Sequence, residues 1–250
     1  MDPLLVLSAG AIGIVLGATG GGGALLAVPV FVHLMHIDPR LAIAMSLPVV
    51  GLTSLVGALG HWAAGHVQIR PALAFGAVAM TGAYLGARLS TWLSGTTQLT
   101  ILSFVMIAAA VSLWQRSRTS TLVATSHEPP TRSLVLLAAV GFGVGVLTGL
   151  VGVGGGFLFA PALTLLMGMP LSHAAGTSLL IIAMNAAAGF AGYAGQVVMP
   201  WRTVGEFVAV AAAASLVGLA LARVIPQRAF QRAFAVFLLV IAAALLYQRV

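Results

Sequence analysis

The hydrophobic pattern of the chain predicts a protein built from membrane-crossing helices. A hydrocarbon core of ~30 Å is crossed by a helix of about 20 apolar residues. Apolar stretches that meet this length recur along the chain, and we expect each of them to be a full transmembrane span. They are residues 40–64, 71–93, 97–115, 171–196, 203–223 and 229–248.

The regions 3–36 and 133–169 are apolar but are interrupted by glycines near the middle. Each covers about 34 residues, which at ~1.5 Å per residue is too long for one crossing and short for two. Consecutive glycines destabilise a helix by up to ~1 kcal/mol each. We therefore predict two helical hairpins, re-entrant or just spanning, each with a glycine-rich tip within or near the membrane. The predicted fold is all-α, with 8–10 helical segments.

The two halves of the chain repeat each other at the offset from Pro29 to Pro161, which is 132 residues. Matches of glycine and arginine are informative in a chain dominated by leucine and alanine. At this offset Gly13, Gly17, Gly20, Gly22, Gly23 and Arg70 meet Gly145, Gly149, Gly152, Gly154, Gly155 and Arg202. We predict two membrane repeats, residues 1–115 and 133–250, joined by the polar linker 116–132.

The number of crossings predicts how the repeats are oriented. Each half crosses an odd number of times whether its hairpin spans or returns, so the second repeat is inverted relative to the first. Placing the linker in the cytoplasm puts more arginines inside than outside, as the positive-inside rule requires. Both termini are then expected to be periplasmic.

Composition and charge exclude several classes of protein. Hydrophobic residues make up 60% of the chain and charged residues only 6%, against ~25% charged in soluble domains. The net charge of +7 comes from arginines that lie mostly between apolar stretches, which favours a topological role over nucleic-acid binding. The absence of cysteine excludes disulfides, thiolate metal sites and thiol catalysis.

The glycine tips are the first candidate for a binding site. Each leads directly into a helix, whose N-terminus offers unpaired N–H donors and about half a positive charge. Two such ends converging near the midplane would suit a small oxyanion, whereas the alternative is close helix packing. The predicted substrate-binding glycines are Gly20, Gly21, Gly22, Gly23, Gly152, Gly154, Gly155 and Gly156.

Polar residues within the spans that follow the hairpins are the second candidate. Thr53 and Asn185 occupy matched positions in the two repeats. Buried polar side chains in a bilayer are costly and often functional, although Ser and Thr also bond to carbonyls of their own helix. The predicted substrate-binding side chains are Ser46, Thr53, Thr177, Ser178 and Asn185.

Residues near the ends of matched spans are candidates for gating or proton transfer, with interfacial anchoring as the alternative. They are His61, Tyr193 and Gln196. His33, His36 and Asp38 form a cluster without thiol support, which we interpret as a solvated loop rather than a metal site.

The duplicated element, GGGGALLAVP in one half and GVGGGFLFAP in the other, is followed by IAMSL at 43–47 and AGTSL at 175–179. In these motifs and their order the chain resembles the sulfite exporter (TauE/SafE) family of membrane permeases. The resemblance implies a permease that exports small sulfur-containing anions, such as sulfite, sulfonates or sulfoacetate, across a bacterial inner membrane. The first half departs from the second, with Met45 where the other has Thr177.

Two other classes of function remain as alternatives. A cation or metal permease would normally place carboxylates, histidines or thiols within the spans. A membrane-embedded enzyme would need a nucleophile with a base, or paired carboxylates, at membrane depth. The sequence offers neither arrangement, so we expect a transporter without catalytic residues, cofactor or nucleic-acid partner, acting on a small anion in the bilayer.

Overall fold

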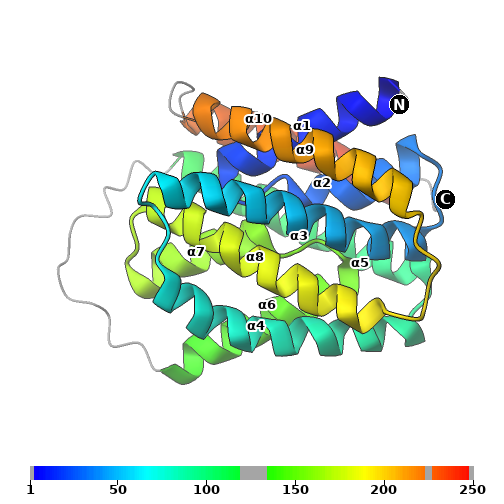
Figure 1. Ribbon diagram of the computed structural model, residues 1–250, viewed down its shortest axis with the longest axis horizontal. Coiled ribbons are helices and arrows are strands. Elements are labelled where there is room, and N and C mark those ends of the chain that lie inside the picture. Colours follow the sequence, from blue (N-terminus) through cyan, green and yellow to red (C-terminus); the bar gives the residue numbers. More distant parts are fainter. Residues whose placement is uncertain (1–2, 119–133, 223–226, 248–250) are drawn as a thin grey trace.

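The computed structural model describes residues 3–118, 134–222 and 227–247, and that part of the chain is all-helical (Figure 1). Most of the predicted linker 116–132 lies outside the described residues. A π-helical turn, Val30–Leu34, follows α2, and a 3₁₀ turn, Ser90–Trp92, follows α4. The helices are α1 (Pro3–Thr19), α2 (Ala24–Pro29), α3 (Pro39–Ala63), α4 (Ile69–Leu89), α5 (Gly95–Arg118), α6 (Leu134–Val151), α7 (Gly156–Met167), α8 (Leu171–Tyr193), α9 (Trp201–Leu221) and α10 (Gln227–Tyr247).

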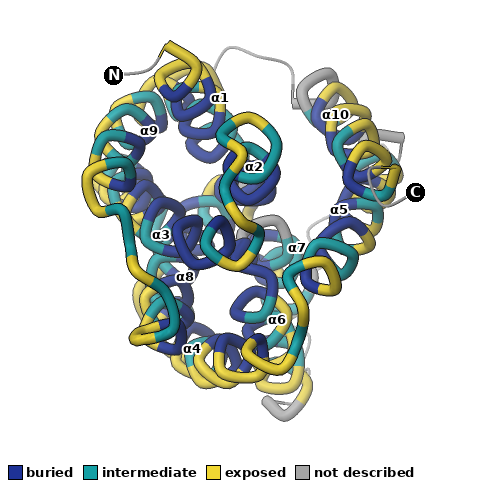
Figure 2. The backbone as a smooth tube through the Cα atoms, turned by 90° about the vertical axis from the view of Figure 1, so that its right-hand side faces the viewer, coloured by how far each residue is buried: buried dark blue, intermediate teal, exposed yellow. Residues whose placement is uncertain are grey.

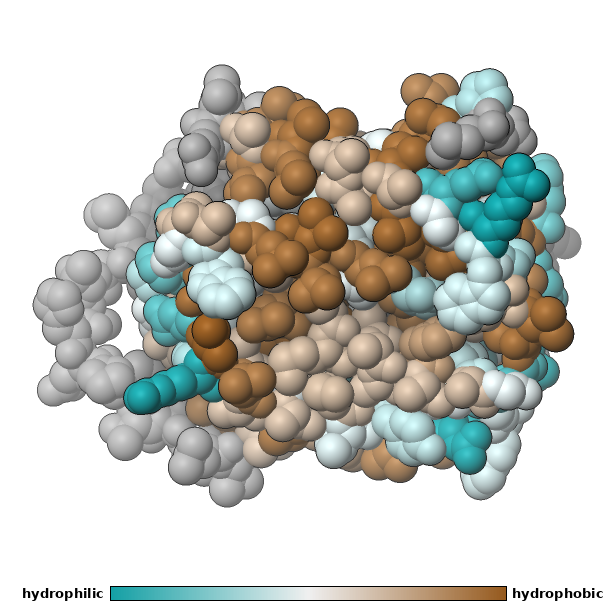
Figure 3. All heavy atoms as spheres, viewed as in Figure 1, coloured by the Kyte–Doolittle hydropathy of each residue, from teal (hydrophilic) through white to brown (hydrophobic). Residues whose placement is uncertain are grey.

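Five helices in the described ranges are long and apolar enough to cross a membrane, namely α3, α4, α5, α8 and α9. The described part of α10 falls among the shorter apolar helices, as do α1 and α6. In Figure 3 apolar side chains cover the middle of the visible face and hydrophilic ones gather toward its two ends. The prediction of an all-α polytopic membrane protein is confirmed.

The helices form two groups that meet at a central pair. In Figure 2 α1, α2, α3 and α9 surround one centre, while α4, α6, α7 and α8 surround another. The helices α3 and α8 pack against each other between these groups, and α5 packs with α10 at one side. Each group therefore contains one helix from the other half of the sequence, namely α9 in the first group and α4 in the second. The two halves of the chain do not form two separate groups of helices.

The helix bounds repeat at the same offset as the glycines. Shifted by 132 positions, Ile69–Leu89 of α4 becomes Trp201–Leu221 of α9. The central helices α3 and α8 run in opposite directions (Figure 1), because Gly57 lies near Leu179 while Gly189 lies near Leu47. These contacts fit two inverted repeats, whose sense of insertion in the membrane stays a prediction.

The outer glycines let helices from opposite halves approach closely. A Cβ on Gly13 or Gly17 of α1 would lie 2.2 or 2.0 Å from a carbonyl oxygen of α9. A Cβ on Gly145 or Gly149 of α6 would lie 2.1 or 2.0 Å from a carbonyl oxygen of α4. Small residues serve this purpose between membrane helices because dispersion contacts must replace the missing hydrophobic drive. Close helix packing therefore explains these four glycines, which precede the two glycine tips in the sequence.

Candidate functional site

The first glycine break joins α1 to α2 and is buried. Gly20 and Gly21 have φ of 70° and 132°, a backbone region that favours glycine. Their N–H groups both donate to the carbonyl of Leu16, and that of Gly22 donates to Thr19 Oγ1 at 2.7 Å. The N–H groups of Ala24–Leu26 donate to the carbonyls three residues earlier. The prediction of unpaired donors is wrong at these positions, because tight turns already use them.

The second break joins α6 to α7, and there too N–H groups donate to carbonyls within the turn. Gly152, Gly154 and Gly155 have φ of 75°, 61° and 74°, and Gly156 begins α7. The N–H groups of Gly152 and Val153 donate to the carbonyl of Thr148, and that of Gly155 donates to Val153. These three N–H groups are therefore also used by turns.

A serine from the opposite half holds each break. Ser46 on α3 donates to the carbonyl of Gly152, and Ser178 on α8 donates to the carbonyl of Gly20 at 2.6 Å. The two serines occupy matched positions in the repeats, as do the two glycines. Each serine also lies within bonding distance of a carbonyl of its own helix, three residues earlier. We call these two cross-half contacts the serine latches.

The two breaks do not meet at a point. Gly152 is level with Ser46 of α3, and Gly20 is level with Gly57, which lies near Leu179 beside Ser178. The residues from 46 to 57 of α3 span about 16 Å. The returning helices α2 and α7 do contact each other, but they run in opposite directions toward the starts of α3 and α8. The structure thus gives two latched breaks on either side of the centre instead of one cradle of converging N-termini.

A buried polar pair lies beside the second break. Asn185 of α8 is 1% exposed and its Nδ2 donates to Thr148 Oγ1 of α6 at 2.5 Å. Thr148 Oγ1 in turn donates to the carbonyl of Gly145 at 2.8 Å. Thr148 was not among the residues identified from the sequence, because it lies in the hairpin region 133–169 and not in the span that follows it.

Within the described ranges, certain buried side-chain oxygens have no hydrogen-bond partner. They include Asn185 Oδ1, Thr53 Oγ1 and Ser54 Oγ. Thr53 is fully buried and matches Asn185 at the repeat offset. A buried acceptor without a partner costs about 1–3 kcal/mol. Thr53 and Asn185 are matched in the two repeats, and a polar ligand bound between the central helices would supply the hydrogen bonds that their oxygens lack.

Thr177 differs from the other predicted site residues because its hydroxyl contacts the start of α4. Its Oγ1 accepts a hydrogen bond of 3.0 Å from the N–H of Gln68, which immediately precedes α4. The contact ties the start of α4 to α8. This contact differs from the structural alternative considered for threonine, which was a bond to a carbonyl of its own helix.

The predicted gating residues lie at the two ends of the central helices. The His61 ring is buried and lies 6.1 Å from that of His66, which lies 5.4 Å from that of His173. Tyr193 Oη donates to the carbonyl of Leu150 at 3.4 Å, just before the second break. Gln196 Nε2 donates to Gly192 within its own turn at 2.7 Å. In the portion of the chain that is described, no three His, Asp or Glu side chains are grouped to hold a metal.

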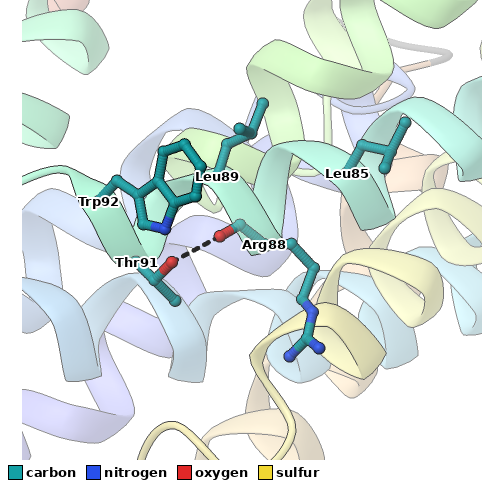
Figure 4. Close-up of a pocket in the computed structure, with 5 residues that line it drawn as sticks. All are labelled: Leu85, Arg88, Leu89, Thr91 and Trp92. Atoms are coloured by element: carbon teal, nitrogen blue, oxygen red, sulfur yellow. Dashed lines mark hydrogen bonds between the residues drawn. The ribbon is translucent and has the colours of Figure 1, made fainter.

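Two pockets on the described surface lie away from the breaks. One, of about 330 Å³, is lined by Leu85, Arg88, Leu89, Thr91 and Trp92 at the exposed end of α4 (Figure 4). The other, of about 310 Å³, is lined by apolar residues of α4, α6 and α7. Neither of these two pockets is lined by a predicted site residue.

Comparison with known proteins gives consistent matches over most of the chain. A family model described as sulfite exporter TauE/SafE matches residues 5–245. A probable membrane transporter protein of Xylella fastidiosa (strain 9a5c) is 32% identical over 203 residues, covering 80% of this chain and 77% of the relative. The probable membrane transporter protein YdhB of Bacillus subtilis (strain 168) is 29% identical over 196 residues, covering 76% and 78%. No solved structure matches the chain.

Proposed function

The chain belongs to the sulfite exporter TauE/SafE family and is a multi-pass membrane permease, and from this premise we propose that it exports small sulfur-containing anions. The substrates are sulfite, sulfonates or sulfoacetate, and the membrane is the bacterial inner membrane, with both termini on the periplasmic side. The path runs along α3 and α8 past the two glycine breaks. The residues that would meet the substrate there are Gly20–Gly23, Gly152, Gly154, Gly155, Gly156, Ser46, Thr53, Ser178 and Asn185.

The observation that carries this proposal is the pair of serine latches. Each latch joins a broken hairpin of one half to a central helix of the other half. Transporters with inverted repeats move one group of helices against the other around a site near the midplane. A solute that passes between the halves has to separate these contacts, and glycine turns can rearrange because they carry no Cβ.

The buried polar residues favour an uncoupled anion over a cation. In the described ranges the fully buried polar side chains are Ser, Thr, Asn, Gln and His, with no carboxylate. A membrane potential that is negative inside drives a monoanion outward by about 2.3 kcal/mol per 100 mV. Export by uniport therefore needs no titrating carboxylate in the membrane.

Flux through purified protein in liposomes tests the proposal. Vesicles are loaded with labelled sulfite, and efflux is followed with and without an imposed potential that is negative inside. We expect saturable efflux that the potential accelerates. Transport of a divalent metal without transport of any of these anions would instead support the cation permease.

A matched pair of glycine variants locates the path. Gly155→Ala and Gly168→Ala both place a Cβ at positive φ, 74° and 64°, at opposite ends of α7. At Gly155 the Cβ would lie 2.5 Å from Thr148 Cγ2, whereas at Gly168 nothing lies within 4 Å. We expect Gly155→Ala to abolish efflux in protein that still inserts, and Gly168→Ala to retain it. Equal efflux from the two variants would remove the second break from the path.

A further inference from the structure

The orientation of the Asn185 side-chain amide is set by its neighbour. A threonine hydroxyl has one hydrogen to donate, and that of Thr148 is directed to the carbonyl of Gly145. Thr148 Oγ1 can therefore only accept from Asn185, which requires Nδ2 on that side. The amide nitrogen and oxygen are distinguished here by the hydrogen-bond network, as they must be. Asn185 Oδ1 consequently faces the other way.

The oxygen that faces away is buried and lacks a partner among the described residues. An amide oxygen is an acceptor only, so the group that would satisfy it must bring an N–H or O–H. A fully deprotonated oxyanion brings neither and would be repelled. A ligand that binds at Asn185 Oδ1 must therefore carry a proton on the atom that meets this oxygen.

Thr53 of α3 lies at nearly the same depth as Asn185 of α8. Gly51 of α3 lies near Ala186 of α8, so Thr53 and Asn185 are within about one turn of each other along the bundle axis. Thr53 is seven residues after Ser46, and Asn185 is seven after Ser178, which puts each on the latch-bearing face of its helix. Its hydroxyl is both a donor and an acceptor.

Resting on the proposed function, we infer that Asn185 Oδ1 accepts a hydrogen bond from the transported anion, and that the substrate is therefore an oxyanion that keeps one O–H. For sulfite this is the hydrogen sulfite monoanion and not the dianion. The Thr53 hydroxyl donates to a deprotonated oxygen of the same ligand, and Thr148 is a positioning residue that directs Oδ1 inward.

The charge of the site agrees with this selectivity. Within the described ranges no Arg, Lys, Asp or Glu is fully buried, so the site does not neutralise a ligand. The cost of moving an ion out of water rises with the square of its charge, which makes a dianion about four times as costly as a monoanion of equal size. A sodium ion could also use the two oxygens, but hard cations are normally held with carboxylate help.

Two monoanions of similar shape provide the test. Hydrogen sulfite can donate an O–H, whereas methanesulfonate carries one charge and has no donor. Competition between them is measured in liposomes on the acid side of neutrality, as the ratio of their kcat/KM values. We expect wild-type protein to favour hydrogen sulfite by about tenfold or more, as one hydrogen bond to a buried group allows. Raising the pH should slow sulfite efflux but not methanesulfonate efflux.

Variants of Asn185 and Thr148 test whether these two residues produce that ratio of kcat/KM values. Asn185→Leu and Thr148→Val should each bring the ratio close to one, the first by removing the acceptor and the second by freeing the amide to turn. Asn185→Thr, which keeps an oxygen, should restore part of it. A structural role alone would change the rate for both anions without changing their ratio.

The outcomes separate the two proposals. Equal kcat/KM values for the two anions in wild-type protein, or a ratio that persists in Asn185→Leu, would overturn the inference while leaving anion export intact. Efflux of neither anion would overturn the proposed function. Sodium-dependent methanesulfonate efflux that Asn185→Leu abolishes would assign Oδ1 to a cation and would also overturn the inference.

Discussion

Ser178 donates its hydroxyl hydrogen to the carbonyl oxygen of Gly20 at 2.6 Å, although 158 positions separate the two residues in the chain. Ser46 makes the matched contact with Gly152. Each contact satisfies a carbonyl in a break that the bilayer cannot solvate. The two latches thus stabilise the arrangement of helices that the structure shows.

Removing a latch should destabilise this arrangement. Ser178→Ala leaves the Gly20 carbonyl buried without this donor, which we expect to lower the free energy of unfolding by about 1–3 kcal/mol. Thermal unfolding in detergent measures the loss. Ser54→Ala is the control, because Ser54 is equally buried on α3 but its hydroxyl has no partner in the described part of the chain. Similar melting temperatures for the two variants would argue that the latch contributes nothing to stability.

The packing glycines should fail in a different way from the tip glycines. Gly149→Ala would put a Cβ 2.0 Å from the carbonyl oxygen of Ala83, so α6 must move off α4. We expect loss of folded, monodisperse protein in size-exclusion chromatography. Gly143→Ala on the same helix meets nothing within 4 Å and should be neutral or stabilising by up to ~1 kcal/mol. Normal yield of Gly149→Ala would contradict the close approach of the two helices.

Thr177 should affect stability without affecting substrate recognition. Thr177→Val removes the acceptor for the Gln68 N–H at the start of α4, and loss of a helix-terminus acceptor costs about 1 kcal/mol. We expect a lower melting temperature with the KM for sulfite unchanged. Thr100→Val, at a threonine bonded within its own helix, should melt close to wild type. A raised KM at unchanged stability would return Thr177 to the substrate path.

The membrane orientation can be read with single cysteines, since the natural chain has none. Ala63 ends α3, and Val198, which is 93% exposed, lies after α8 at the opposite end of the bundle. With the linker in the cytoplasm, Ala63→Cys should be protected from an impermeant thiol reagent in intact cells, while Val198→Cys should be labelled. The reverse pattern would place both termini in the cytoplasm.

Much of the fold could be predicted because its determinants are local. Apolar runs such as 71–93 correspond to α4 within a few residues, since the bilayer thickness sets the length of a helix that must satisfy its own backbone. Gly20–Gly23 and Gly152–Gly156 mark the breaks for an equally local reason, the conformations that glycine adopts and other residues avoid. The offset of 132 residues predicted which helices would be equivalent.

The site could be predicted only in part. Asn185 and the serines were identified as polar residues within spans, but their partners, Thr148 and the opposite breaks, were not. His66 and His173 were not identified from the sequence, and the antiparallel pairing of α3 with α8 brings them to one end of the bundle. Several N–H groups expected to be unpaired at the breaks, among them those of Gly20, Gly21 and Gly152, are used by turns, which depends on backbone geometry and not on composition.

The sequence by itself determined where helices form, where they break and that the halves are copies, because each of these depends on residues within a few turns and on the bilayer. Tertiary structure alone decided that α1 packs on α9 and α6 on α4, that each half latches the other's break, and that the breaks stand apart. Those contacts join residues more than fifty positions apart, and their energies depend on which helix faces meet once α4 and α9 each pack in the group formed by the other half of the chain.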